Sequence, residues 1–135
     1  MAIIEWADEL SVHVKQIDQE HQQLVELINN LHEAMKARAG KEAVGIAIDC
    51  LIKYTEFHFG AEEALMTKHG FLSSTVHRAE HRAFVAKTQE FAKGYAAGKL
   101  LLSMDVMNFL KVWLTEHICK VDKELGIFLN SRGVN

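Results

Sequence analysis

One short segment of the chain combines a base and a carboxylate at helical spacing. His58 and Glu62 lie four residues apart in HFGAEE, and residues four apart on a helix differ in direction by about 40°. They therefore share one face of a helix, together with the apolar residues Leu51 and Leu65. Polar groups directed into a core are costly unless they find partners, so the segment predicts a buried polar site.

Three further segments place imidazoles on apolar helical faces. Each of these histidines lies three, four or seven residues from apolar residues that would line a core. A single inward histidine is more often a satisfied core residue than a ligand. Five with a glutamate, however, present many donors and acceptors that one metal site would satisfy together. We therefore predict a metal site that includes His21, His58, Glu62, His77, His81 and His117.

The elements that position these residues follow from the spacing of apolar side chains. Apolar residues recur every three or four positions along four stretches, which is typical of amphipathic helices, and strand-like alternation is missing. The sequence has no proline, the strongest helix breaker. We expect helices over about residues 19–38, 42–67 and 74–93, a fourth helix after residue 103, and a short tail near 123–130.

Capping residues and glycines set the expected ends of these helices. Short polar side chains can accept hydrogen bonds from first-turn N–H groups, and glycine allows the left-handed turn that often closes a helix. The expected caps are Asp18, Ser73 or Ser74, and Ser103, with Asp105 in the first turn of the fourth helix. The expected closing glycines are Gly40, Gly70, and Gly94 with Gly98.

Four amphipathic helices with short connections predict an all-α, up-down-up-down four-helix bundle. We expect the first 17 residues to form an N-terminal arm anchored by Ile3, Ile4 and Trp6, and the tail to be a short C-terminal helix. In antiparallel order, histidines near the starts of the first and third helices meet those near the ends of the second and fourth. All four helices thus bring imidazoles to one end of the bundle.

The composition indicates a single domain over residues 1–135. The net charge of −3 argues against a nucleic-acid partner. A membrane span is not expected, since no run of about 18 apolar residues occurs. The start, MAIIEWADEL, does not resemble a secretory signal. With only two cysteines, Cys50 and Cys119, a disulfide framework is not expected either. We therefore expect a cytoplasmic protein.

The donor types narrow the choice of metal. Imidazole with carboxylate suits zinc, copper, iron or nickel, whereas calcium and magnesium prefer oxygen ligands. Neither cysteine shares a helical face with the histidines. Five histidines exceed what one tetrahedral zinc ion uses, so a pair of octahedral ions is the natural interpretation.

Four segments in order resemble the ligand segments of the hemerythrin family: IDQEH at 17–21, HFGAEE at 58–63, HRAEH at 77–81 and HICKVD at 117–122. Trp113 and Leu114 before the last segment resemble the single-domain bacteriohemerythrins. The resemblance extends over essentially the whole chain, but His13 and Leu72 depart from the glycine and proline usual in the family. Both departures concern connecting segments rather than the donor residues.

This resemblance implies two non-haem iron ions. His77, His81 and His117 would bind one iron, and His21 and His58 the other. Glu62 and Asp122 would bridge them together with an oxo or hydroxo group, which leaves one position open on the iron held by His21 and His58. The family's chemistry there is reversible binding of dioxygen, held as peroxide. We expect Leu114, Trp113, Ile118 and Phe57 to wall the pocket and keep it dry.

Asp122 is the one donor whose spacing does not fit a regular helix. It lies five residues after His117, about 140° around a regular helix. We therefore predict a local distortion between Ile118 and Asp122, such as a π-bulge.

The resemblance favours oxygen transport, storage or delivery, with no catalytic residues, over two alternatives. One is an oxygen or redox sensor; the other is a di-iron enzyme that acts on peroxide or nitric oxide. A protein partner that receives the oxygen is compatible with the carrier function, but nothing in the sequence identifies it.

Overall fold

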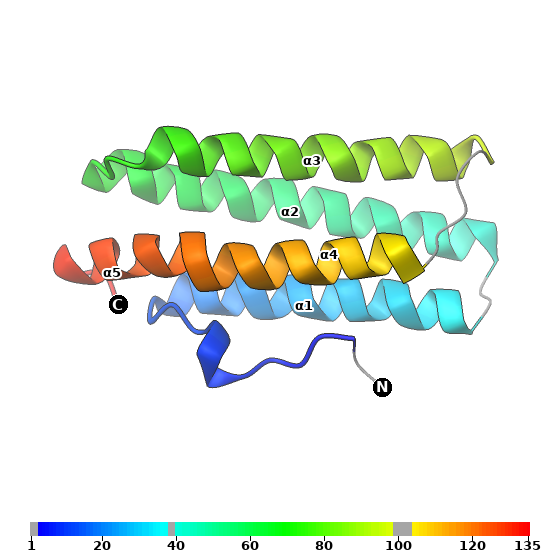
Figure 1. Ribbon diagram of the computed structural model, residues 1–135, viewed down its shortest axis with the longest axis horizontal. Coiled ribbons are helices and arrows are strands. Elements are labelled where there is room, and N and C mark those ends of the chain that lie inside the picture. Colours follow the sequence, from blue (N-terminus) through cyan, green and yellow to red (C-terminus); the bar gives the residue numbers. More distant parts are fainter. Residues whose placement is uncertain (1–2, 38–39, 99–103) are drawn as a thin grey trace.

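Four long helices pack side by side in the computed structural model, which describes residues 3–37, 40–98 and 104–135 (Figure 1). Successive helices run in opposite directions, and the N-terminal arm lies along the outside of the bundle. The predicted all-α, up-down-up-down bundle with an arm and a helical tail is therefore confirmed. The elements are η1 (Asp8–Leu10), α1 (Lys15–Lys36), α2 (Lys41–His69), α3 (Ser74–Ala96), α4 (Met104–Glu116), the π-helix η2 (His117–Asp122) and α5 (Lys123–Ser131).

Each long helix buries much of the apolar stripe that its sequence predicts. Burying one such aliphatic or aromatic side chain stabilises the fold by about 1.5–3 kcal/mol. Within the described ranges, no helix is both long and apolar enough to cross a bilayer. The buried stripes include Leu24, Ile28 and Leu31 of α1, Leu51 and Phe59 of α2, Phe84 of α3, and Leu110 and Leu114 of α4.

The start of α1 differs from the prediction. The helix begins at Lys15 without a side-chain cap, so Asp18 lies inside the first turn. Asp18 instead holds the arm, because its carboxylate accepts hydrogen bonds from the Val12 N–H at 2.8 Å and the Ser11 hydroxyl at 2.6 Å. The prediction that Asp18 caps the helix was therefore wrong. Its negative charge in the first turn still stabilises the helix by interacting with the positive end of the helix dipole.

The glycines close two of the first three helices as expected. Gly70 ends α2 with a φ of 72°, and Gly98 follows α3 with a φ of 71°, both in the left-handed region that glycine tolerates. Gly94 lies within α3 rather than at its exit. Gly40 directly precedes α2, and α1 ends earlier, at Lys36.

The serine caps are not borne out where the structure describes them. Ser73 precedes α3 but makes no side-chain hydrogen bond to the first turn. Its hydroxyl lies 3.5 Å from Glu124 Oε1 instead. The predicted cap at Ser103 and the side chain of Asp105 lie outside what the structure describes.

The arm is fastened to α1 by one asparagine. The Asn29 side chain accepts hydrogen bonds from the Ile3 and Ile4 N–H groups, each at 3.0 Å, and donates one to the Ile4 carbonyl at 2.9 Å. Ile4 is buried, and Ile3 and Trp6 pack against the core. The predicted anchoring of the arm is therefore confirmed.

His13 adopts a conformation that explains why glycine is expected at its position. Its φ is 60°, in the left-handed region where glycine costs least. Its carbonyl accepts a hydrogen bond from the Asn130 side chain at 3.0 Å, which links the arm to the end of α5. The chain therefore makes the turn into α1 without glycine.

Candidate metal centre

The predicted histidines meet at the end of the bundle where α1 and α3 begin and α2 ends, next to η2 (left in Figure 1). Four helical elements contribute to this layer, as the antiparallel order predicts. Each of the seven predicted donor residues is at most 3% exposed. They are His21, His58, Glu62, His77, His81, His117 and Asp122.

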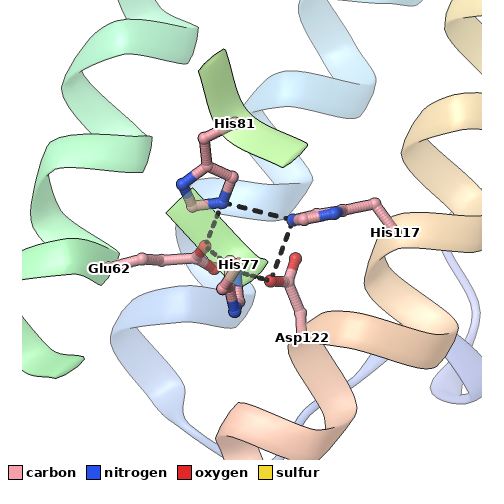
Figure 2. A group of neighbouring side chains, drawn as sticks. All are labelled: Glu62, His77, His81, His117 and Asp122. Carbon is pink, nitrogen blue, oxygen red and sulfur yellow. Dashed lines mark hydrogen bonds and ion pairs between the residues drawn. The ribbon is translucent and has the colours of Figure 1, made fainter. Parts of the chain in front are cut away.

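Glu62 lies between two groups of histidines. Its Oε1 atom is 3.3 Å from His77 Nε2 and 3.1 Å from His81 Nε2 (Figure 2). Its Oε2 atom is 3.4 Å from His21 Nε2 and 3.2 Å from His58 Nε2. Each oxygen of this carboxylate therefore faces a different pair of imidazoles.

Asp122 divides its two oxygens in the same way. Its Oδ1 atom is 2.9 Å from His77 Nε2 and 3.2 Å from His117 Nε2, and its Oδ2 atom is 3.0 Å from His21 Nε2. The π-helix η2 makes this possible, because a wider turn brings residues five apart onto one face. The predicted distortion before Asp122 is therefore confirmed.

The donor atoms form two overlapping sets, each within 4.8 Å. One set holds five donors and the other four, and both contain Glu62 and Asp122. Among the described residues, His21 Nε2, His58 Nε2 and both Asp122 oxygens are buried without a hydrogen bond of acceptable geometry. Buried polar atoms that converge without satisfying one another fit metal coordination better than a hydrogen-bonded core. The sets are Glu62, His77, His81, His117 and Asp122, and His21, His58, Glu62 and Asp122.

Mutual contact shifts the ionisation of these groups. Burial favours neutral carboxyl groups, but the surrounding imidazoles outweigh it and hold the pKa of Glu62 and of Asp122 well below their usual range. Burial lowers the pKa of the histidines, but the two carboxylates outweigh it and raise the pKa of His21 to about 10 and of His77 to about 9. The metal-free centre therefore holds protons that bound metal would displace.

A second layer of carboxylates contacts the outer nitrogens of three histidines. Glu20 Oε1 is 2.7 Å from His58 Nδ1, and Glu63 Oε2 is 3.1 Å from His81 Nδ1. Glu80 Oε1 is 3.0 Å from His117 Nδ1. In each pair a glutamate of one helix contacts a histidine of another helical element. Carboxylates in this position orient a metal-binding imidazole and increase its basicity.

Sequence reasoning did not identify these three glutamates. Each one is adjacent to a predicted donor in the sequence: Glu20 precedes His21, Glu63 follows Glu62, and Glu80 precedes His81. This adjacency is the feature of the sequence that could have pointed to them. It does not identify the histidine that each glutamate contacts, however, because that histidine lies on another helical element.

Aromatic rings pack flat against two of the histidines. Phe59 lies 3.7 Å from the His81 ring with an interplanar angle of 2°, and Trp113 lies 4.5 Å from the His117 ring at 12°. Leu114 and Ile118, two of the residues expected to wall the pocket, are buried. Phe57 is 60% exposed, so its assignment to that wall was wrong.

The other candidate donors lie outside both sets. His32 is half-buried on α1, His69 lies in the last turn of α2, and His13 is exposed in the arm. Cys50 and Cys119 are free and exposed. These five residues are therefore not needed to explain the centre.

Comparisons with known proteins agree with this arrangement. Residues 12–126 match the family model for the hemerythrin HHE cation binding domain. The chain is 33% identical to the bacteriohemerythrin of Methylococcus capsulatus over 132 residues, which cover 97% of this chain and 100% of that protein. It is 36% identical to a bacteriohemerythrin of Pseudomonas aeruginosa over 120 residues, which cover 87% of this chain and 76% of that protein.

A solved structure of wild-type hemerythrin has a TM-score of 0.89 and 32% identity to this chain, and covers 95% of this chain and 98% of its own. The chain belongs to the hemerythrin family, as its four ligand-like segments predicted. Its buried cluster of histidine, glutamate and aspartate fits a non-haem di-iron site.

Proposed function

We propose that this protein binds dioxygen reversibly at a di-iron centre and serves oxygen transport, storage or delivery. The observation that carries the proposal is the sharing of Glu62 and Asp122 between two donor sets. Each carboxylate presents one oxygen to each side, as residues that bridge two ions must. His77, His81 and His117 would complete one iron site, and His21 and His58 the other.

Bound ferrous iron would supply the electrons that dioxygen takes up on binding and returns on release. The donor set favours reversibility, because five neutral imidazoles and only two carboxylates provide little negative charge to stabilise more highly oxidised iron. Carboxylate-rich bundles with Glu-x-x-His pairs are the contrasting case. We therefore favour an oxygen carrier over an enzyme.

The number of donors also supports one open coordination position on one of the two ions. The set that contains His21 and His58 has four donors, one fewer than the set that contains His77. Leu114 and Ile118 lie three residues before and one residue after His117 and are buried, and such apolar residues exclude the water that would promote irreversible oxidation. We propose that dioxygen binds on the side of His21 and His58.

Visible absorption under controlled oxygen tests the proposal. The reduced, iron-loaded protein should be nearly colourless, gain a charge-transfer band in air and lose it under vacuum through repeated cycles. Irreversible oxidation on first exposure to air would contradict the carrier function.

A matched pair of variants tests the assigned donors. His58→Ala should lower iron content and abolish the oxygen-dependent band, whereas His32→Ala, at a half-buried histidine on α1 outside both sets, should retain both. Unchanged iron content in His58→Ala would contradict the assignment.

A further inference from the structure

We propose that the two metal positions fill in order, first the position of His77, His81 and His117, then that of His21 and His58. We further propose that Glu63 and Glu80 are the positioning residues that set this order. The inference rests on the two-metal centre of the proposed function, but it does not depend on whether oxygen binds there.

Two of the three histidines at the first position are held in place twice. His81 contacts the Glu63 carboxylate through Nδ1 at 3.1 Å and stacks on Phe59 at 3.7 Å. His117 contacts Glu80 through Nδ1 at 3.0 Å and stacks on Trp113 at 4.5 Å. A bond at one ring nitrogen combined with a flat aromatic contact fixes the direction of the opposite nitrogen, which reduces the ordering needed when metal binds.

The second position is less constrained. His58 contacts Glu20 through Nδ1 at 2.7 Å, but His21 Nδ1 is buried without a hydrogen-bond partner among the described residues. The two rings meet edge to face at 4.7 Å, a contact that leaves more freedom than parallel stacking. Only one of the two imidazoles here is therefore oriented by a carboxylate, against two of three at the first position, where His77 Nδ1 is the one without a described partner.

Charge and donor number act in the same direction. The first set has five donors and the second four, and Glu63 and Glu80 add negative charge next to the first. Arg78 offsets part of this charge, since its guanidinium is 3.5 Å from Glu63 Oε1. Because both sets share Glu62 and Asp122, an ion already bound repels the next one. The second ion should therefore bind more weakly than the first.

Titration of the metal-free protein with Co²⁺ under argon tests the order. We expect two calorimetric steps, the first at least tenfold tighter. The electron paramagnetic resonance signal of isolated Co²⁺ should peak at one equivalent and decline as the second ion couples to the first. Two equal steps, or a signal that shows ions distributed equally over both positions at one equivalent, would overturn the proposed order.

Charge-removing variants test the positioning residues, because glutamine keeps the size of glutamate and an acceptor oxygen. Glu63→Gln and Glu80→Gln should each weaken the first step by about 10- to 100-fold, as is typical when a carboxylate behind a metal ligand is altered. Glu20→Gln, the matched control, should weaken only the second step. Thermal unfolding of each metal-free variant monitors the fold.

A uniform loss of affinity in both steps for all three variants would indicate a merely structural role and would overturn the assignment. A protein that takes up Co²⁺ in order but does not bind oxygen reversibly with iron would contradict the proposed function alone. Equal Co²⁺ steps in a protein that binds oxygen reversibly would contradict the filling order alone.

Discussion

Replacing Gly126 by alanine should force the N-terminal arm away from α5. The added Cβ would lie 3.0 Å from Val12 Cβ, 3.2 Å from the Val12 carbonyl carbon and closer still to its oxygen. Backbone contacts this short cannot be relieved by rotating a side chain, so the arm or the helix must move. Overpacking of this kind costs about 1–3 kcal/mol, and alanine returns up to about 1 kcal/mol of helix propensity. We expect a net loss of about 1–2 kcal/mol.

Thermal unfolding followed by circular dichroism measures this loss. For a chain of 135 residues, 1 kcal/mol corresponds to about 4 °C, so Gly126→Ala should melt about 4–8 °C below wild type. Gly60→Ala is the matched control, because Gly60 lies within α2 and a Cβ there meets nothing within 4 Å. It should melt about 2–4 °C higher. A melting temperature for Gly126→Ala at or above wild type would refute the described packing of the arm.

Three further outcomes can be measured. Asp122→Ala should lower iron content, because both donor sets lose an oxygen, whereas Cys119→Ala, exposed on the same π-helix, should retain it. In the metal-free protein, the pKa of His21 is about 10 and that of His77 about 9, against 6.5 for the unperturbed group. The free energy of unfolding in urea with a chelator should therefore be greatest between about pH 4.5 and 6.5. It should fall as the pH rises through the histidine values, and also at more acidic pH as Glu62 and Asp122 take up protons; a flat profile would contradict the contacts. Asn29→Ala removes three hydrogen bonds to the arm and should reduce stability by about 2–3 kcal/mol in the same assay.

The level of the histidines could be predicted from sequence because helix geometry relates position to direction and depth. His58 and Glu62 share a helical face because they lie four residues apart. Four antiparallel helices bring His21 and His117 to the same end of the bundle as His77. This inference needs no exact boundaries. The inference therefore holds even though α1 begins at Lys15 rather than after Asp18. The earlier start does not change which face of the helix His21 occupies, and His21 is buried.

The outer glutamates could not be predicted in the same way. Glu63 and Glu80 are partly exposed, and glutamates on solvent-facing parts of helices are ordinary in soluble proteins. Their contacts with His81 and His117 depend on the rotation and separation of neighbouring helices, which a hydrophobic pattern does not specify. The prediction that Phe57 lines the pocket was wrong because it relied on residue type alone. Its type suggested a core position, but Phe59, two residues on, faces inward and leaves Phe57 on the outside.

Asp122 shows how local backbone geometry can decide a site that residue types only suggest. On a regular helix it would point about 140° away from His117, and its spacing alone favours a solvated aspartate. The π-helix His117–Asp122 reverses that outcome and buries the carboxylate completely. Such segments are rare and often occur at functional sites. Here the wider turn brings one carboxylate into contact with imidazoles from α1, α3 and η2. The irregular backbone is therefore what allows the last helical segment to provide both a histidine and a shared oxygen donor to the same buried centre.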